Sequence, residues 1–312
     1  MSKNVVDAII EFSNKNGINV GLIPSRRQID KEGGYSNNWT TKSFSEYVRS
    51  RSDLVYLQRD HSGPGQGERD DDGYESLEED CKYFDSIHVD PWKRYNLYHE
   101  GLSETIKIIN FCNEKNSQIK FEIGTEESIR RFDPDEVERL IIDLKNLLSA
   151  ESFSRIERVV IQSGTALREN ENTGLYNQDR LREMISVVRK HGLLTKEHNG
   201  DYQTSQSIFE KFSLGLDSMN FAPEMGLIET EFYLENMDDI EDFWRICYSS
   251  NRWKKWVDNS FDPVLRKKDL IKICGHYVFS NDDFQSLIKS YDANFSAKEM
   301  ITKKLEDLYG LR

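Results

Sequence analysis

The sequence predicts an α/β fold, a (β/α)8 TIM barrel, over most of its 312 residues. Short β-prone runs recur about every 20 to 40 residues, the spacing expected when each strand is followed by a helix and a return loop. A closed barrel is the commonest way to use so many parallel units. The predicted strands are residues 18–23, 54–58, 86–89, 119–123, 158–162, 193–196 and 214–221.

Helical patterns lie between these runs. Asp133 stands at a cap position, Pro134 follows it, and acidic residues precede an apolar face, an order typical of a helix start. Further helices are predicted at residues 101–113, 179–191, 238–247, 280–291 and 297–308.

After about residue 225 the regularly spaced β-prone runs are no longer found. We therefore predict a barrel domain over residues 1–235 and a C-terminal helical segment over residues 236–312 that completes or caps the barrel. An irregular eighth strand is expected from this tail.

Composition limits the class of protein. With 37% hydrophobic residues, 16 Phe and 14 Tyr, the chain can bury a large core. Its apolar runs are far shorter than the roughly 20 residues that cross a bilayer, and no export signal is visible. The four cysteines stand apart without a CxxC pair, as expected for reduced structural thiols. We expect a soluble, cytoplasmic protein with no membrane partner.

The net charge of −13 disfavours a nucleic-acid partner, because such binders usually display a basic face. It leaves room for an anionic small molecule in a local basic pocket.

Polar residues gather where the predicted strands end. In a barrel the reacting groups lie at the carboxyl ends of the strands, which open onto one mouth. The candidates, in strand order, are Arg26 and Gln28, Asp60 and His61, His88 and Asp90, Glu122 and Glu126, Gln162 and Ser163, His198 and Asn199, and Asn220. Three of the six histidines of the chain thus fall at the predicted mouth.

This pattern indicates a metal site. Histidine nitrogen and carboxylate oxygen are the ligands of a catalytic zinc, and His61, His198 and one of Glu122 or Glu126 would supply them. Such an ion polarises a carbonyl, and Asp60 would move the proton. The alternatives are a buried Asp-His couple at residues 60–61 and a histidine at position 88 that only packs in the barrel.

Two segments are candidates for anion recognition. Residues 163–165, Ser-Gly-Thr, can present backbone N–H groups to a phosphate, with Arg26, Arg27 or Arg168 supplying charge. Residues 251–256 form a second basic patch, or else a helix face whose lysines extend along apolar surface.

Five motifs occur in one order along most of the chain: RDHSGPG (59–65), IHVD (87–90), IGTE (123–126), VIQSG (160–164) and EHNGDYQT (197–204). Together they resemble the tagatose-bisphosphate aldolase accessory-subunit family, which belongs with the class II, metal-dependent aldolases. The resemblance implies a TIM barrel, a divalent metal, usually zinc, and chemistry on ketose phosphates at C3–C4.

By this resemblance Asp60 matches the catalytic acid/base, His61 and His198 match two metal ligands, and Glu126 matches the acidic residue of the GTE element. Glu122 instead suits the pattern of the catalytic class II aldolases, so the metal-binding glutamate stays open. Gln162 stands where those aldolases have a further histidine ligand.

We therefore expect an aldolase-like lyase that acts on a ketose or ketose phosphate through an enediolate. The alternatives are a C4 epimerase, a non-catalytic stabilising subunit of an aldolase, and a sugar isomerase. A homo-oligomer or an aldolase partner subunit is also expected. The residues expected to contact substrate are Arg26, Gln28, His88, Asp90, Gln162, Ser163, Asn199 and Asn220.

Overall fold

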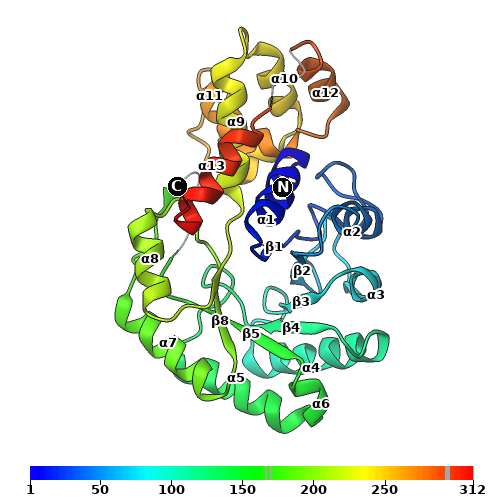
Figure 1. The fold of residues 1–312 in the computed structure, drawn as a ribbon, viewed down its shortest axis with the longest axis vertical. Coiled ribbons are helices and arrows are strands. Elements are labelled where there is room, and N and C mark those ends of the chain that lie inside the picture. The colour runs from blue at the N-terminus through cyan, green and yellow to red at the C-terminus, as the bar shows by residue number, and fades with distance from the viewer. Residues whose placement is uncertain (166, 169–170, 292–295, 312) are drawn as a thin grey trace.

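The computed structural model describes residues 1–165, 167–168, 171–291 and 296–311. Seven parallel strands form one curved sheet in the order β1-β2-β3-β4-β5-β8-β9 (Figure 1). Each predicted strand overlaps one of them. They are β1 (Val20–Leu22), β2 (Val55–Ser62), β3 (Ser86–Val89), β4 (Lys120–Ile123), β5 (Ile156–Ile161), β8 (Leu194–Glu197) and β9 (Ser218–Met219).

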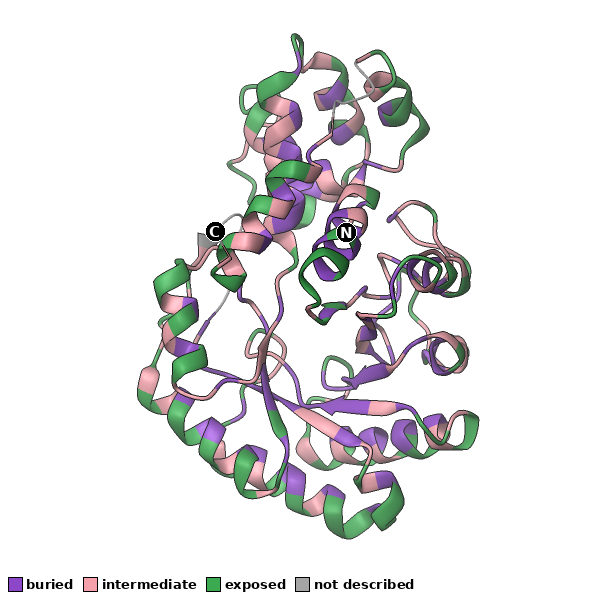
Figure 2. Cartoon of the chain, viewed as in Figure 1, coloured by how far each residue is buried: buried purple, intermediate pink, exposed green. Residues whose placement is uncertain are grey.

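Helices cover the outer face of the sheet, and their buried sides face the strands (Figure 2). The predicted cap at Asp133 is present, because its side chain accepts the N–H of Glu136 at 2.9 Å. The covering helices are α2 (Thr41–Arg49), α3 (Tyr74–Tyr83), α4 (Tyr98–Lys115), α5 (Pro134–Leu147), α6 (Ala150–Phe153), α7 (Gln178–Lys190) and α8 (Ser205–Ser213). A two-stranded antiparallel ribbon, β6 (Leu167–Arg168) with β7 (Glu171–Asn172), precedes α7.

The barrel is not closed in the part of the chain that the structure describes. No pairing joins β9 to β1 there, and only helical elements follow β9, so the expected eighth strand is absent from those residues. After β9 the chain enters helix α9 at Pro223, a residue that suits a first helical position, and does not extend beside β1. A cavity of about 1600 Å³ lies on this open side and is lined from β1, β2, β8 and β9.

The tail forms a helical appendage with its own core (Figure 1). Its elements are α9 (Pro223–Asn236), α10 (Glu241–Ser249), the 3-10 turn η1 (Arg252–Lys255), α11 (Lys267–Cys274), the 3-10 turn η2 (Gly275–Tyr277) and α12 (Asp282–Ile288). Helix α9 runs across the predicted domain boundary at residue 235.

The last helix returns to the barrel. Helix α13 (Lys298–Tyr309) packs against the first helix, α1 (Lys3–Asn16), and Ile301 and Leu305 share a core cluster with Val6 and Phe12. All four cysteines are free and buried. Among the described residues, no helix is long and apolar enough to cross a bilayer.

Candidate metal centre

An irregularity at the end of β2 shapes the site. The register between β2 and β3 shifts between Arg59 and Ser62, and His61 has a φ of 44°, which is uncommon for a residue with a side chain. A bulge of this kind re-aims side chains and occurs often beside active sites. Here it allows Asp60 and His61, although adjacent in sequence, to join one side-chain cluster.

Arg59 anchors this strand from the opposite face. Its guanidinium is fully buried and forms a two-point ion pair with Asp80 of α3, at 2.7 and 2.8 Å. It also donates to the carbonyls of Pro24 and Ile29. The position of Asp60 and His61 is therefore fixed by a buried network.

The cluster contains Asp60, His61, His88 and His198, with one possible ligand atom of each within 4.8 Å of all the others. The ring centroids of His61 and His198 are 5.3 Å apart, and His88 lies 4.9 Å from both. The structure thus brings together the two histidines expected as metal ligands. It adds His88, which the sequence suggested as a substrate contact.

Each of the three imidazoles uses one nitrogen for a partner outside the cluster. Nδ1 of His61 lies 2.6 Å from Asp90 Oδ2, Nε2 of His88 lies 3.0 Å from the carbonyl of Gly124, and Nε2 of His198 lies 2.8 Å from Glu122 Oε1. Metal-bound histidines usually have this second partner, which fixes the tautomer and directs the other nitrogen at the ion. In His88 that other nitrogen, Nδ1, accepts the backbone N–H of His61 at 3.3 Å, and a bound cation would replace this hydrogen bond. Glu122, expected as a ligand, takes this outer position.

The donor set also fits a cation. The Oδ1 atom of Asp60 is buried and has no hydrogen-bond partner in the described structure. A buried polar atom without a partner is costly, and a water or substrate hydroxyl held by a cation in the cluster would satisfy it. Three imidazoles match the nitrogen ligands of a catalytic zinc, with the carboxylate of Asp60 beside them.

The charges of the site depend on one another. Burial alone would raise the pKa of Asp60, but the neighbouring histidines, His61 foremost, hold it well below its usual range. Burial opposes protonation of His61, yet Asp60 and Asp90 raise its pKa to about 10. Burial lowers the pKa of His198. The site therefore attracts positive charge, and a proton and a metal ion compete for the same imidazole.

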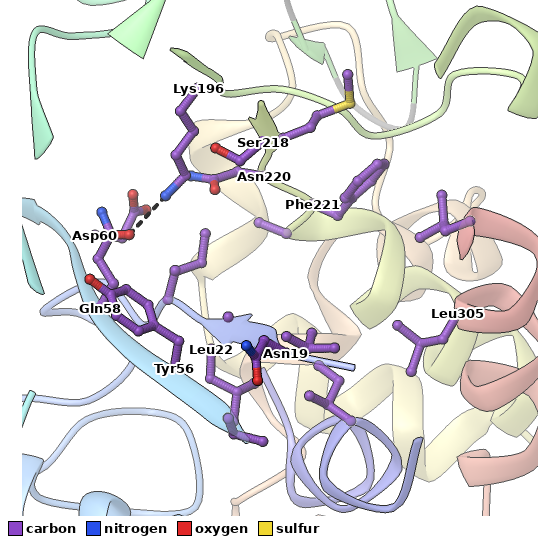
Figure 3. A pocket seen from close by; sticks show the side chains of 18 of the residues that line it. Asn19, Leu22, Tyr56, Gln58, Asp60, Lys196, Ser218, Asn220, Phe221 and Leu305 are labelled. Atoms are coloured by element: carbon purple, nitrogen blue, oxygen red, sulfur yellow. Dashed lines mark hydrogen bonds between the residues drawn. The ribbon is translucent and has the colours of Figure 1, made fainter. Parts of the chain in front are cut away.

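A lysine and a glutamine that the sequence analysis missed complete the floor of the site. Lys196 Nζ lies 2.9 Å from both Glu122 Oε2 and Gln58 Oε1. Gln58 and Asp60 of β2 face Lys196 of β8 at the edge of the large cavity (Figure 3). The signal was present, because positions 58 and 60, like 196 and 198, share one face by strand alternation.

Three residues that we expected to contact substrate form hydrogen bonds or ion pairs within the protein. Arg26 is buried and pairs with Asp71 through two contacts of 2.7 Å, and with Asp30 at 3.0 Å, so its charge is already neutralised. Gln162 holds the backbone of Phe132, Thr125 and Arg130. Gln28 accepts the N–H of Ser25 at 2.9 Å, although it also lines the large cavity.

The Ser-Gly-Thr segment does not face the cluster. Ser163 and Thr165 both donate to the buried carboxylate of Glu197, which pairs with Lys211 at 2.7 Å. A carboxylate of the chain itself thus satisfies both hydroxyls, and recognition of phosphate by the backbone N–H groups of this segment stays a prediction. The side chain of Arg168 lies outside the described residues.

The remaining candidates border the site. Asp90 orients His61, as described above. Glu126 stands outside the cluster and accepts from Ser128 at 2.7 Å, but its charge helps to raise the pKa of His61. Asn199, directly after His198, has a φ of 64°, and its carbonyl accepts from Asn172 at 3.2 Å. Asn220 is buried at the rim of the large cavity.

The fold is that of several solved sugar-enzyme structures. The chain matches a probable tagatose 6-phosphate kinase from Sinorhizobium meliloti 1021 with a TM-score of 0.73 and 15% identity, over 99% of this chain and 97% of that one. The YdjI aldolase from Escherichia coli K12 matches with a TM-score of 0.57 and 12% identity, over 98% and 87%.

The fructuronate-tagaturonate epimerase UxaE from Cohnella laeviribosi matches with a TM-score of 0.58 and 10% identity, over 86% of this chain and 70% of that one. At these identities the likeness shows a shared fold. No family model and no curated protein matches the sequence.

Proposed function

We propose that this chain is a metal-dependent enzyme of the aldolase type that acts on a ketose or ketose phosphate. The observation that carries the proposal is the cluster of His61, His88 and His198 beside Asp60, in which every imidazole has an outer partner. The shared fold with an aldolase and an epimerase of sugar acids supports the substrate class.

The three histidines would hold the cation, most plainly zinc, because a catalytic site with three protein ligands keeps a position open for substrate. When bound, such an ion supplies Lewis acidity at a carbonyl oxygen of the sugar. Glu122 would orient His198, and Asp90 would orient His61. The ligand set thus differs from the sequence-based one by taking His88 in place of a glutamate.

Asp60 is the residue placed to move a proton. Its carboxylate stays ionised at neutral pH, has one oxygen without a hydrogen-bond partner, and borders the large cavity. It can therefore accept a proton from a sugar hydroxyl or carbon. Lys196 would bring a positive charge near the enediolate oxygens as they become negative, held there by Glu122 and Gln58.

Aldol cleavage between C3 and C4 and epimerisation at C4 both begin with the removal of a proton from the sugar, the step that we assign to Asp60. The epimerase therefore stays the second candidate, and the UxaE fold is the observation that favours it. A non-catalytic stabilising subunit is the third, and it needs neither a bound metal nor an ionised Asp60.

Metal analysis followed by a substrate screen tests the proposal. We expect about one zinc or comparable ion per chain in the wild type and its loss in His61→Ala and His88→Ala, whereas His99→Ala, which removes an exposed histidine of α4, keeps it. The metal-loaded protein is then incubated with ketoses, ketose phosphates and keto sugar acids. A triose product indicates a lyase, and a diastereomer alone indicates an epimerase. Absence of metal binding would reject both.

A further inference from the structure

A small pocket with four cationic side chains opens beside the metal centre. It has a volume of about 250 Å³, and its wall includes Asp60 and His61 of the centre itself. The rest of the wall is Ser25, Arg27, Tyr35, Gln66, Lys93, Arg252, Lys255 and Tyr277. We call this the basic pocket.

The basic pocket has two walls from distant parts of the chain. Arg27 follows β1 and Lys93 follows β3, whereas Arg252 and Lys255 belong to η1 of the helical appendage. The walls are joined by Ser280, whose hydroxyl donates to the Tyr35 carbonyl at 2.8 Å and accepts the N–H of Asn37 at 2.5 Å.

Two rings reinforce this junction. Tyr35 of the barrel and Tyr277 of the appendage meet edge to face, with centroids 4.9 Å apart. The Arg252 guanidinium lies 5.3 Å from the Tyr35 centroid and 5.6 Å from that of Tyr277. The cations of the two walls are therefore held facing one shared space.

The charge of the basic pocket is poorly balanced. Within the described part of the chain, Arg27, Lys93 and Lys255 have no carboxylate within 4.0 Å, and Arg252 has only the exposed Glu68 at 3.4 Å. Desolvation and the facing cations lower the pKa of Lys255, as desolvation and Arg27 do for Lys93. Arg27 and Lys93 donate to the carbonyls of Gly67 and Gly65, both at 3.2 Å, which carry no net charge. Asp60 is the one carboxylate among the lining residues, so four cations share this space with a single negative charge.

We propose that the basic pocket binds the phosphate group of a sugar phosphate whose reacting carbons lie at the metal centre. Arginine and lysine are the usual partners of phosphate, and charge-assisted hydrogen bonds are the strong ones. Binding of a remote phosphate would hold the sugar in place for reaction. The inference rests on the proposed function and narrows its substrate from ketoses in general to phosphorylated ones.

Inorganic phosphate is the probe, and calorimetry on the full chain in EDTA at low salt is the measurement. Because EDTA removes metal ions, phosphate binding here tests the basic pocket separately from the metal centre. The wild type is compared with two double variants, one for each wall: Arg27→Gln with Lys93→Gln, and Arg252→Gln with Lys255→Gln. Lys254→Gln is the matched control, because it neighbours both appendage cations but does not line the pocket.

We expect saturable binding by the wild type and by the control, and an affinity at least about tenfold weaker in each double variant. A thermal melt shows whether each double variant is folded. If one of them is not, the double variant of the other wall still tests the proposal. No saturable binding by the wild type, an unchanged affinity in a folded double variant, or an equal affinity for acetate would overturn the proposal. If the protein binds phosphate but no metal ion, the proposed function is wrong, whereas the assignment of the basic pocket as a phosphate site is retained.

Discussion

The hydrogen bond between Asp90 and His61 offers a quantitative test of the metal centre. Asp90 is fully buried, and its Oδ2 lies 2.6 Å from His61 Nδ1, a short contact typical of a charge-assisted bond. The substitution Asp90→Asn keeps an acceptor of similar shape but removes the negative charge that orients the imidazole and increases its basicity. Replacing such outer partners weakens metal binding about 10- to 100-fold, or by roughly 1.4 to 2.8 kcal/mol.

The assay is competition for zinc with a chromophoric chelator at neutral pH, with the midpoint of thermal unfolding measured in parallel. Asp90 accepts the backbone N–H of Trp92 at 3.3 Å in addition to its bond with His61. Asp217→Asn is a suitable control, because Asp217 likewise accepts a backbone N–H, that of Thr195 at 2.8 Å, but lies outside the cluster. Its zinc affinity should equal that of the wild type. If a folded Asp90→Asn protein bound zinc within threefold of the wild type, the assignment of His61 as an oriented ligand would be wrong.

Three further predictions concern stability. Removing either member of the buried Arg59–Asp80 pair, by Arg59→Met or Asp80→Asn, should lower the free energy of unfolding in urea by about 3 to 5 kcal/mol, and the double variant should lose less than the sum. Gly101→Ala should lower the free energy of unfolding by about 1 to 3 kcal/mol, and with it the thermal midpoint, because the new Cβ would lie 2.2 Å from the Trp92 ring. An unchanged midpoint would mean that the ring moves away freely. Burial raises the pKa of Asp201 to about 7, so the folded state binds its proton more tightly than the unfolded chain, and stability falls as pH rises from about 4 through 7. Asp201→Asn should therefore gain stability over the wild type, on the order of 4 kcal/mol for a shift of about three pKa units, at pH 8 but little at pH 4. A gain independent of pH would contradict this reasoning.

The sequence predicted the strands well because their pattern is local. Each of the seven apolar runs overlaps a strand, and the residues at the ends of the second and sixth runs meet at one site. The eighth strand, expected from the tail after about residue 225, is absent from the described residues, where only helical elements follow β9. Whether a barrel closes depends on pairing between its first and last strands, which are distant in sequence, so no local pattern encodes it.

The differences between the expected and the observed arrangement of the site have physical causes as well. Strand alternation cannot anticipate a bulge, and without the bulge at His61 the neighbours Asp60 and His61 would point to opposite faces. Arg26 and Arg27 look equivalent in the sequence. Only the fold shows that Asp30 and Asp71 neutralise the first and leave the second beside Arg252 and Lys255, more than two hundred positions away.

The pairing of α1 with α13 has a consequence for synthesis of the protein. The apolar face of α1, with Val6 and Phe12, emerges from the ribosome well before its partners Ile301 and Leu305, which lie on a helix far along the chain. A growing chain therefore leaves this surface incompletely covered until α13 has been translated, and such surfaces favour aggregation. Truncations that remove the last helix should accumulate in inclusion bodies even though every residue of the metal centre and of the basic pocket is still present.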